Sequence, residues 1–113
     1  MLQGRDAIFQ ACGAETRHFR APHGFRSPFV TPAVRAAGEQ TVGWTLGVRD
    51  SDCPGDAEIA RRVLRGVAPR SIVLLHDGDG YDPLGDRTQT VKAVAAIIPA
   101  LRAQGYGFEV LPG

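Results

Sequence analysis

Apolar and polar positions follow one another along the chain in blocks of strand and helix length. Short runs rich in β-branched and aromatic residues are typical of strands, and the sequence contains four: TRHFR (16–20), QTVGWTL (40–46), SIVLL (71–75) and YGFEVL (106–111). The segments beside these runs have the composition or spacing of helices, over residues 2–12, 27–38, 56–67 and 87–104. Strands that alternate with helices in this way indicate an α/β fold of parallel β-α units.

Two of the predicted helices have an apolar face. Residues 56–67 carry apolar side chains at i, i+4 and i+8. This face consists of Ile59, Val63 and Val67. In the last helix the apolar stripe consists of Val91, Val94, Ala95, Ile98 and Leu101. Asp56 and Asp86 are placed to cap these helices, Gly105 is predicted to end the second one, and Pro99 is predicted to kink or split it.

Three of the predicted strands end in residues that can do chemistry. The apolar run 71–75 is typical of a parallel strand covered on both faces, and His76 follows it. The strand 16–20 ends at Arg20, and the next strand contains Trp44 before a polar loop. In a parallel sheet the site lies beyond the carboxyl ends of the strands. We therefore expect Arg20, His76 and the loop after Trp44 to meet in one site.

Composition narrows the class of protein. The chain has 113 residues, enough for a single domain over 1–113, and its net charge of +1 lacks the basic excess of a nucleic-acid-binding protein. No apolar run reaches the length of about 18 residues that a membrane span needs. The first residues have no signal-peptide pattern, so the localisation stays open. Cys12 and Cys53 match neither a metal-binding spacing nor a disulfide framework.

Three short motifs follow one another along the chain: FRAPHG (19–24), WTLGVRD (44–50) and LLH (74–76). In this order they resemble the arginine–proline–aromatic–glycine motif, the aspartate loop and the leucine–any–histidine motif of the polysaccharide deacetylase family. The members of this family are carbohydrate esterases that remove N-acetyl groups from chitin, chitooligosaccharides and peptidoglycan. Residues 86–111 resemble the closing helix and strand. The resemblance runs from about Phe9 to the C-terminus and implies an amino-sugar polysaccharide or oligosaccharide as the substrate.

Two further motifs of the family do not occur in the chain. One is an early strand like Thr-Phe-Asp-Asp-Gly, and the other is a loop like His-x-x-x-His. In the family these motifs supply the metal ligands and the general base. The resemblance therefore implies the C-terminal half of an irregular (β/α) barrel, an incomplete domain. We expect no metal in this chain, a divalent, zinc-like metal only in the complete domain, and no activity of the chain alone.

The resemblance also implies catalytic roles for three residues. His76 would be the acid that protonates the leaving nitrogen, and Asp50 would lie beside it and hold it charged. Arg20 would form an ion pair with the missing base. Gly47 and Ser51 depart from the family's aspartate loop, so either Asp50 or Asp52 is the equivalent aspartate.

Five more residues would bind the substrate. The resemblance places the backbone N–H of His23 toward the oxyanion of the tetrahedral intermediate, in a turn that Pro22 and Gly24 shape. Leu74 would line the pocket for the acetyl methyl group, and Trp44 would support that pocket.

Other interpretations remain open at this stage. One is a non-catalytic half-barrel that binds or assembles with the missing N-terminal half or with a second copy, as a homodimer. Another is an independent small α/β domain. Asp77 and Asp79 also place oxygen ligands at alternating positions, as a calcium loop does. However, the sixth and twelfth positions of that loop hold Asp82 and Thr88, so we expect a solvated turn instead.

Overall fold

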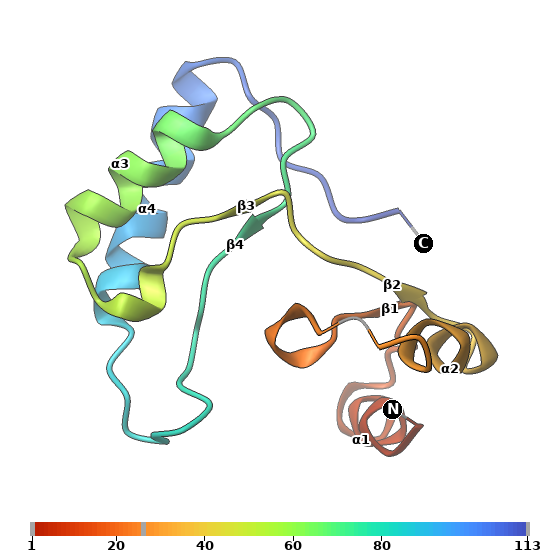
Figure 1. Cartoon of the computed structure of the whole chain (residues 1–113). Coiled ribbons are helices and arrows are strands. Elements are labelled where there is room, and N and C mark those ends of the chain that lie inside the picture. Colours follow the sequence, from red (N-terminus) through yellow and green to blue (C-terminus); the bar gives the residue numbers. More distant parts are fainter. Residues whose placement is uncertain (1, 26, 113) are drawn as a thin grey trace. The chain divides into compact units, whose positions relative to one another are not determined.

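The computed structural model describes residues 2–25 and 27–112, and the chain divides into two compact units (Figure 1). The first unit comprises Met1–Gly43 and Leu111–Gly113, and the second comprises Trp44–Val110. Each unit contains one pair of parallel strands. The predicted α/β class with parallel strands is confirmed.

The first unit joins two helices to a short parallel strand pair. Its elements are α1 (Leu2–Cys12), β1 (His18–Phe19), the 3-10 turn η1 (Pro22–Gly24), α2 (Val30–Ala36) and β2 (Gln40–Thr41). Strand β1 pairs with β2 in the register His18↔Gln40. Helix α2 is followed by Gly38 at φ +76°, a left-handed conformation that glycine adopts without steric cost. Val34 of α2 is fully buried.

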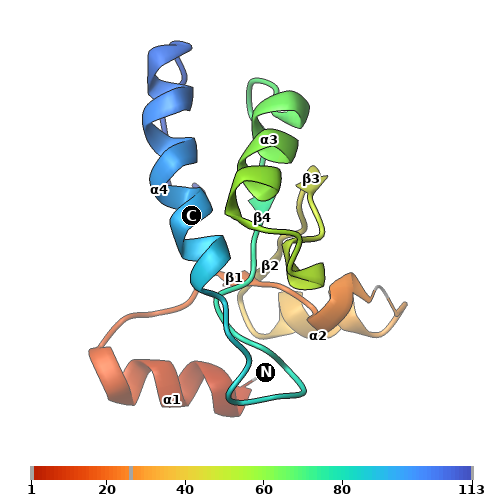
Figure 2. The same cartoon turned by 90° about the vertical axis from the view of Figure 1, so that its left-hand side faces the viewer.

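The second unit packs two helices beside the other strand pair. Its elements are β3 (Leu46–Gly47), the 3-10 turn η2 (Asp50–Asp52), α3 (Asp56–Gly66), β4 (Val73–Leu74) and α4 (Thr88–Ala103). Strand β3 pairs with β4 in the register Leu46↔Val73. Helices α3 and α4 lie side by side (Figure 2). No helix among the described residues is long and apolar enough to cross a membrane.

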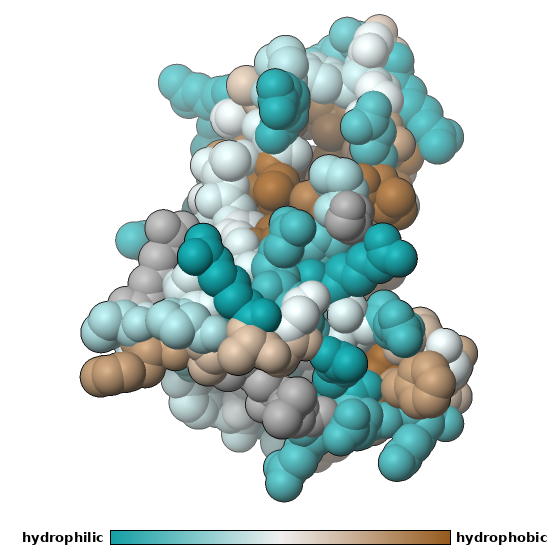
Figure 3. Space-filling view, turned by 90° about the vertical axis from the view of Figure 1, so that its right-hand side faces the viewer, coloured by the Kyte–Doolittle hydropathy of each residue, from teal (hydrophilic) through white to brown (hydrophobic). Residues whose placement is uncertain are grey.

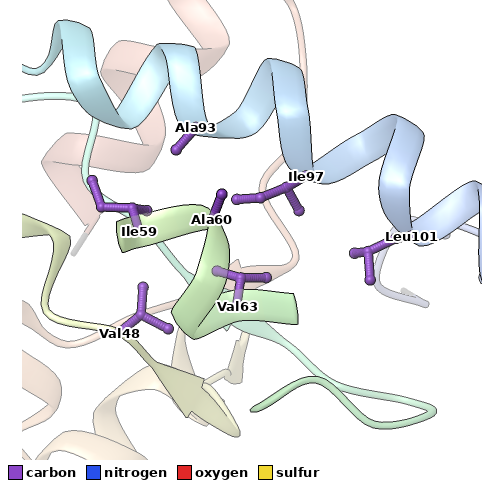
Figure 4. Packing of buried hydrophobic residues seen from close by; sticks show 7 residues of the cluster. All are labelled: Val48, Ile59, Ala60, Val63, Ala93, Ile97 and Leu101. Atoms are coloured by element: carbon purple, nitrogen blue, oxygen red, sulfur yellow. The ribbon is translucent and has the colours of Figure 1, made fainter. Parts of the chain in front are cut away.

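The core of the second unit lies between α3, α4 and the residue that follows β3 (Figure 4). Its buried members are Val48, Ile59, Ala60, Val63, Ala93, Ile97 and Leu101. Ile59 and Val63 are almost fully buried, and Val67 packs against them. This confirms the predicted face of α3. Complete burial of a side chain of this size stabilises the fold by about 1.5–3 kcal/mol.

The predicted stripe of α4 is wrong by about one position. The buried residues of α4 are Thr90, Ala93, Ile97 and Leu101. The side chain of Val91, which belongs to the predicted stripe, is 65% exposed. Leu101 is the one member of the predicted stripe that is fully in the core. Thr90 lies on the buried face of the helix, where the Thr90 hydroxyl donates a hydrogen bond to Asp50. Apolar spacing alone does not indicate this position, because Thr90 is polar.

The ends and continuity of the helices also differ in part from the prediction. Helix α4 is continuous through Pro99, so it is not split. Asp56 does not cap α3, whose cap position is Gly55, and the Gly55 N–H donates to Gln89 Oε1 (2.6 Å). Asp86 does accept a hydrogen bond at the start of α4, from the Thr88 N–H (2.7 Å). Gly105 follows the end of α4 at φ +86°, as predicted.

The predicted strands are shorter in the structure. The run 40–46 is divided between β2 and β3, and residues 106–111 form no strand. The run 71–75 was expected to be covered on both faces, but its side chains are only half-buried. Val73 and Leu75 pack on the core, and strand alternation turns Ile72 and Leu74 to the opposite face. Figure 3 shows hydrophobic surface in its upper part, between hydrophilic side chains.

Candidate functional site

Asp50 is a buried carboxylate held at a sharp bend of the chain. After β3 the chain reverses at Arg49, which has φ +54°, and Asp50 begins the turn η2. The side chain of Asp50 is only 1% exposed. A charge in such a position needs hydrogen-bond partners, because burial removes it from water.

His76 supplies two of these partners. It lies two residues after β4, and its backbone N–H donates to Asp50 Oδ2 (2.8 Å). Its imidazole Nδ1 lies 2.8 Å from Asp50 Oδ1. The two contacts fix both the backbone and the ring of His76 relative to one carboxylate.

Thr90 supplies the third partner. Its hydroxyl donates to Asp50 Oδ2 (3.0 Å) from the first turn of α4. Burial by itself raises the pKa of Asp50, but the hydrogen bonds from His76 and Thr90 outweigh it and lower that pKa below its ordinary value of 3.8. Asp50 is therefore ionised at neutral pH.

The ionised state of Asp50 determines which nitrogen of His76 carries a proton. An ionised carboxylate only accepts hydrogen bonds, so Nδ1 of His76 must be the donor. Nε2 is then the ring nitrogen at which a proton can be exchanged with another molecule. The His76 side chain is 41% exposed while Asp50 is buried beneath it. A histidine oriented by a carboxylate, with one face open, can act as a general acid or base.

Asp52, the alternative partner of His76, lies elsewhere. It is exposed at the end of η2, and every contact between His76 and a carboxylate described above involves Asp50. The geometry thus favours Asp50 over Asp52 as the aspartate that orients the histidine.

Trp44 and Leu74 lie in the same unit as Asp50 and His76. Both side chains are half-buried, and Leu74 pairs with Gly47 across the strands. A Cβ on Gly47 would approach the Trp44 indole nitrogen to 3.3 Å. The absence of a side chain at position 47 gives the indole room to lie against this strand.

The remaining predicted residues lie in the first unit. Arg20 is exposed, and its Nη2 donates to the Gly43 carbonyl (3.2 Å). Pro22 and Gly24 begin and end η1, and the Gly24 N–H donates to Ala21 O (2.9 Å).

His23 occupies the centre of this turn at φ +54°. Its ring meets Phe25 edge-on at a centroid distance of 5.9 Å. The structure thus places four predicted residues in η1 and its flank, and it brings Asp50 and His76 together in the other unit.

Thr90 is a site residue that the sequence analysis missed. The sequence does place Thr90 on the buried face of the last helix, because it lies three residues before Ala93 and seven before Ile97. A polar residue in that row is informative only once its acceptor is known, and Asp50 is 40 residues away in the sequence.

The described residues include no group of three or more His, Cys, Asp or Glu side chains that could hold a metal ion. In the loop after His76, Asp79 accepts hydrogen bonds from the backbone of Tyr81 and Asp82. Asp82 accepts one from Leu84. These carboxylates stabilise the turns of the loop.

Comparison with known proteins identifies relatives. No protein family model matches the chain. A chitooligosaccharide deacetylase from Sinorhizobium fredii is 41% identical over 118 residues, which cover 99% of this chain and 55% of the relative. A peptidoglycan-N-acetylglucosamine deacetylase from Bacillus cereus is 41% identical over 110 residues, with coverages of 96% and 49%. The chain thus spans about half the length of the curated relatives it matches.

Solved structures agree in fold. A CE4 family pseudoenzyme from Bacillus anthracis superposes with a TM-score of 0.80 at 27% identity, over 93% of this chain and 34% of that one. A peptidoglycan N-acetylglucosamine deacetylase superposes with a TM-score of 0.88 at 23% identity, over 98% and 50%. The predicted resemblance is confirmed: the chain is homologous to curated chitooligosaccharide and peptidoglycan deacetylases, and its structural neighbours include a CE4 family member.

Proposed function

We propose that this chain is the C-terminal half of a metal-dependent polysaccharide deacetylase and that His76 is the general acid of the reaction. The observation that carries the proposal is the double contact of His76 with the buried carboxylate of Asp50. It orients the imidazole and assigns the exchangeable proton to Nε2.

The acid acts when the tetrahedral intermediate of amide hydrolysis collapses. The C–N bond breaks, its electron pair goes to the nitrogen, and the nitrogen takes a proton from Nε2 of a doubly protonated His76. The products are acetate and a free amino sugar, and His76 keeps its proton at Nδ1, on Asp50. General acid catalysis of this kind typically contributes a factor of about 10²–10⁴.

The substrate proposed is an N-acetylated amino-sugar polymer, the class of molecule named in the curated relatives. Leu74 is proposed to line the pocket for the acetyl methyl group, with Trp44 as its support. The backbone N–H of His23 is proposed to stabilise the oxyanion, in the turn formed by Pro22 and Gly24. Arg20 is proposed to pair with the general base of the complete protein.

The general base and the divalent, zinc-like metal are assigned to residues outside this chain. The described residues include no group of three or more His, Cys, Asp or Glu side chains that could hold this metal. Alone, the chain is expected to release no acetate from acetylated chitooligosaccharides.

A chimera tests the proposal. The part of the Sinorhizobium deacetylase that this chain does not match is joined in front of residues 1–113. We expect this chimera to release acetate from N-acetylchitooligosaccharides, whereas neither part does so alone. A chimera that folds, by its thermal unfolding transition, and binds zinc but releases no acetate would contradict the proposal.

A non-catalytic binding or assembly module is the second candidate. A structural neighbour of the chain is a CE4 family pseudoenzyme, so the fold also occurs without activity. In that case the chimera should bind chitooligosaccharide in a calorimetric titration and release no acetate.

A further inference from the structure

Arg87 links the two segments that carry Asp50 and His76. It lies at the end of the loop after His76, directly before α4, and its side chain is 9% exposed. Nη1 donates to Ser51 O (3.2 Å) and contacts Cys53 Sγ (3.3 Å), both just after Asp50. Nε donates to Gly78 O (3.2 Å) and Nη2 to Asp79 Oδ2 (2.8 Å), both just after His76. One guanidinium therefore bonds both to the segment that follows Asp50 and to the segment that follows His76.

The geometry of this link suits arginine. A guanidinium has five N–H donors in a fixed plane and can bond in several directions at once, whereas a lysine ammonium is a single point of attachment. The contacts of Arg87 go to two backbone carbonyls, a thiol and a carboxylate. Thr90, one helical turn further on, reaches the Asp50 carboxylate itself. The start of α4 thus holds the Asp50 turn at two places.

We propose that Arg87 is a positioning residue, which fixes the turn 50–53 against the segment 76–79 and so keeps the His76 ring on Asp50. Arg87 does not contact the imidazole, and it acts through the two segments it joins. This inference rests on the proposed function for its catalytic meaning, but the geometry that it describes is independent of that function.

The alternative is that Arg87 stabilises only the loop 77–86. In that case its loss would lower the melting temperature and leave the Asp50–His76 contact unchanged. The measurement must therefore report on the His76 ring itself. The Nδ1–H proton signal of His76 in an NMR spectrum does so, because its exchange with water is slow only while Nδ1 is bonded to the carboxylate.

The test compares Arg87→Met, Arg87→Lys and a control, Arg61→Met, in the 113-residue chain and in the chimera. Arg61 pairs with Glu58 on its own helix, so its loss removes an arginine without touching the link. We expect the Nδ1–H proton to exchange about tenfold faster or more in Arg87→Met, as for loss of a hydrogen bond to a charged group. Arg87→Lys should rescue little of this, and Arg61→Met should match the unmodified chain.

Unchanged exchange in a folded Arg87→Met variant would overturn the inference. If that variant does not fold, Asp79→Asn weakens one contact of the link and should accelerate exchange to a smaller degree. Unchanged exchange in both Asp79→Asn and Arg87→Lys would then overturn it. In an active chimera, Arg87→Met should lower kcat and leave KM unchanged. The NMR result does not need activity, so failure of the deacetylase proposal and failure of the Arg87 role are distinguishable.

Discussion

Asp50 binds His76 through both of its carboxylate oxygens. Oδ2 accepts a hydrogen bond from the backbone N–H of His76, and Oδ1 accepts one from the imidazole Nδ1. The two residues are 26 positions apart in the sequence and follow neighbouring parallel strands. The carboxylate is buried and the ring is partly open. This relationship supports the proposed role of His76.

The hydroxyl of Thr90 should contribute to stability in a pH-dependent way. Because the folded-state pKa of Asp50 is lowered, its ionised form stabilises the fold above the unfolded-state pKa of about 3.9. That contribution is lost as the pH falls through the lowered folded-state value. Thr90→Val should therefore reduce the free energy of unfolding by about 1.5–3 kcal/mol at neutral pH, and by less below pH 4.

Denaturant unfolding from neutral pH down to pH 3 measures this difference. Thr31→Val, at an exposed position of α2, is the matched control and should have little effect. A cost for Thr90→Val that stays constant over this range would mean that the hydroxyl does not act through the ionised carboxylate.

Two substitutions distinguish the observed core from the stripe predicted for α4. Ile97→Ala, in the buried row of α4 but outside the predicted stripe, should lower the free energy of unfolding by about 2–5 kcal/mol, since it leaves a cavity in the core. Val91→Ala, in the predicted stripe but exposed, should change it by no more than about 0.5 kcal/mol. Equal effects in thermal or denaturant unfolding would contradict the orientation of α4.

A side chain at position 47 should disturb the single tryptophan of the chain. In Gly47→Ala the new Cβ would lie 3.3 Å from the indole nitrogen of Trp44, so the indole must shift. We expect a change in the wavelength of the tryptophan emission. Gly78→Ala is the control, because nothing lies within 4 Å of its Cβ position. An emission spectrum identical to that of the unmodified chain would show that Trp44 does not lie against Gly47.

The isolated chain is expected to self-associate or to be marginally folded. Among the described residues, β1 pairs with β2 and β3 pairs with β4 in two separate two-stranded sheets, and unpaired strand edges recruit other strands. Phe108 and Val110 are exposed, and exposed apolar patches often mark interfaces. A second copy, or the N-terminal half proposed for the complete domain, would cover these surfaces.

Light scattering over a dilution series, together with amide exchange of residues 17–21, tests this expectation. A monomer at every concentration with strongly protected amides would favour the independent small α/β domain instead.

Part of this structure could be predicted from the sequence alone. The face of α3 follows from apolar spacing because Ile59 and Val63, four residues apart, are both buried in the same core. The pairing of Asp50 with His76 is consistent with two residues that each follow a parallel strand. The first prediction rests on a local pattern of apolar residues, whereas the pairing of Asp50 with His76 is what the family resemblance implies.

The remainder depends on contacts between distant residues. The burial of Thr90 requires the carboxylate of Asp50, and the contacts of Arg87 require two loops that are already folded. A continuous strand over 40–46 was predicted from β-branched and aromatic residues. Only its ends pair with other strands, because strand formation needs a neighbour as well as propensity.

The central claim, that His76 is the general acid oriented by Asp50, is tested most directly by the turnover of His76→Ala in the chimera. We predict that kcat falls by about 10²–10⁴-fold while KM changes little, since the lost proton transfer belongs to the transition state. A kcat within a few-fold of the unmodified chimera would contradict the account.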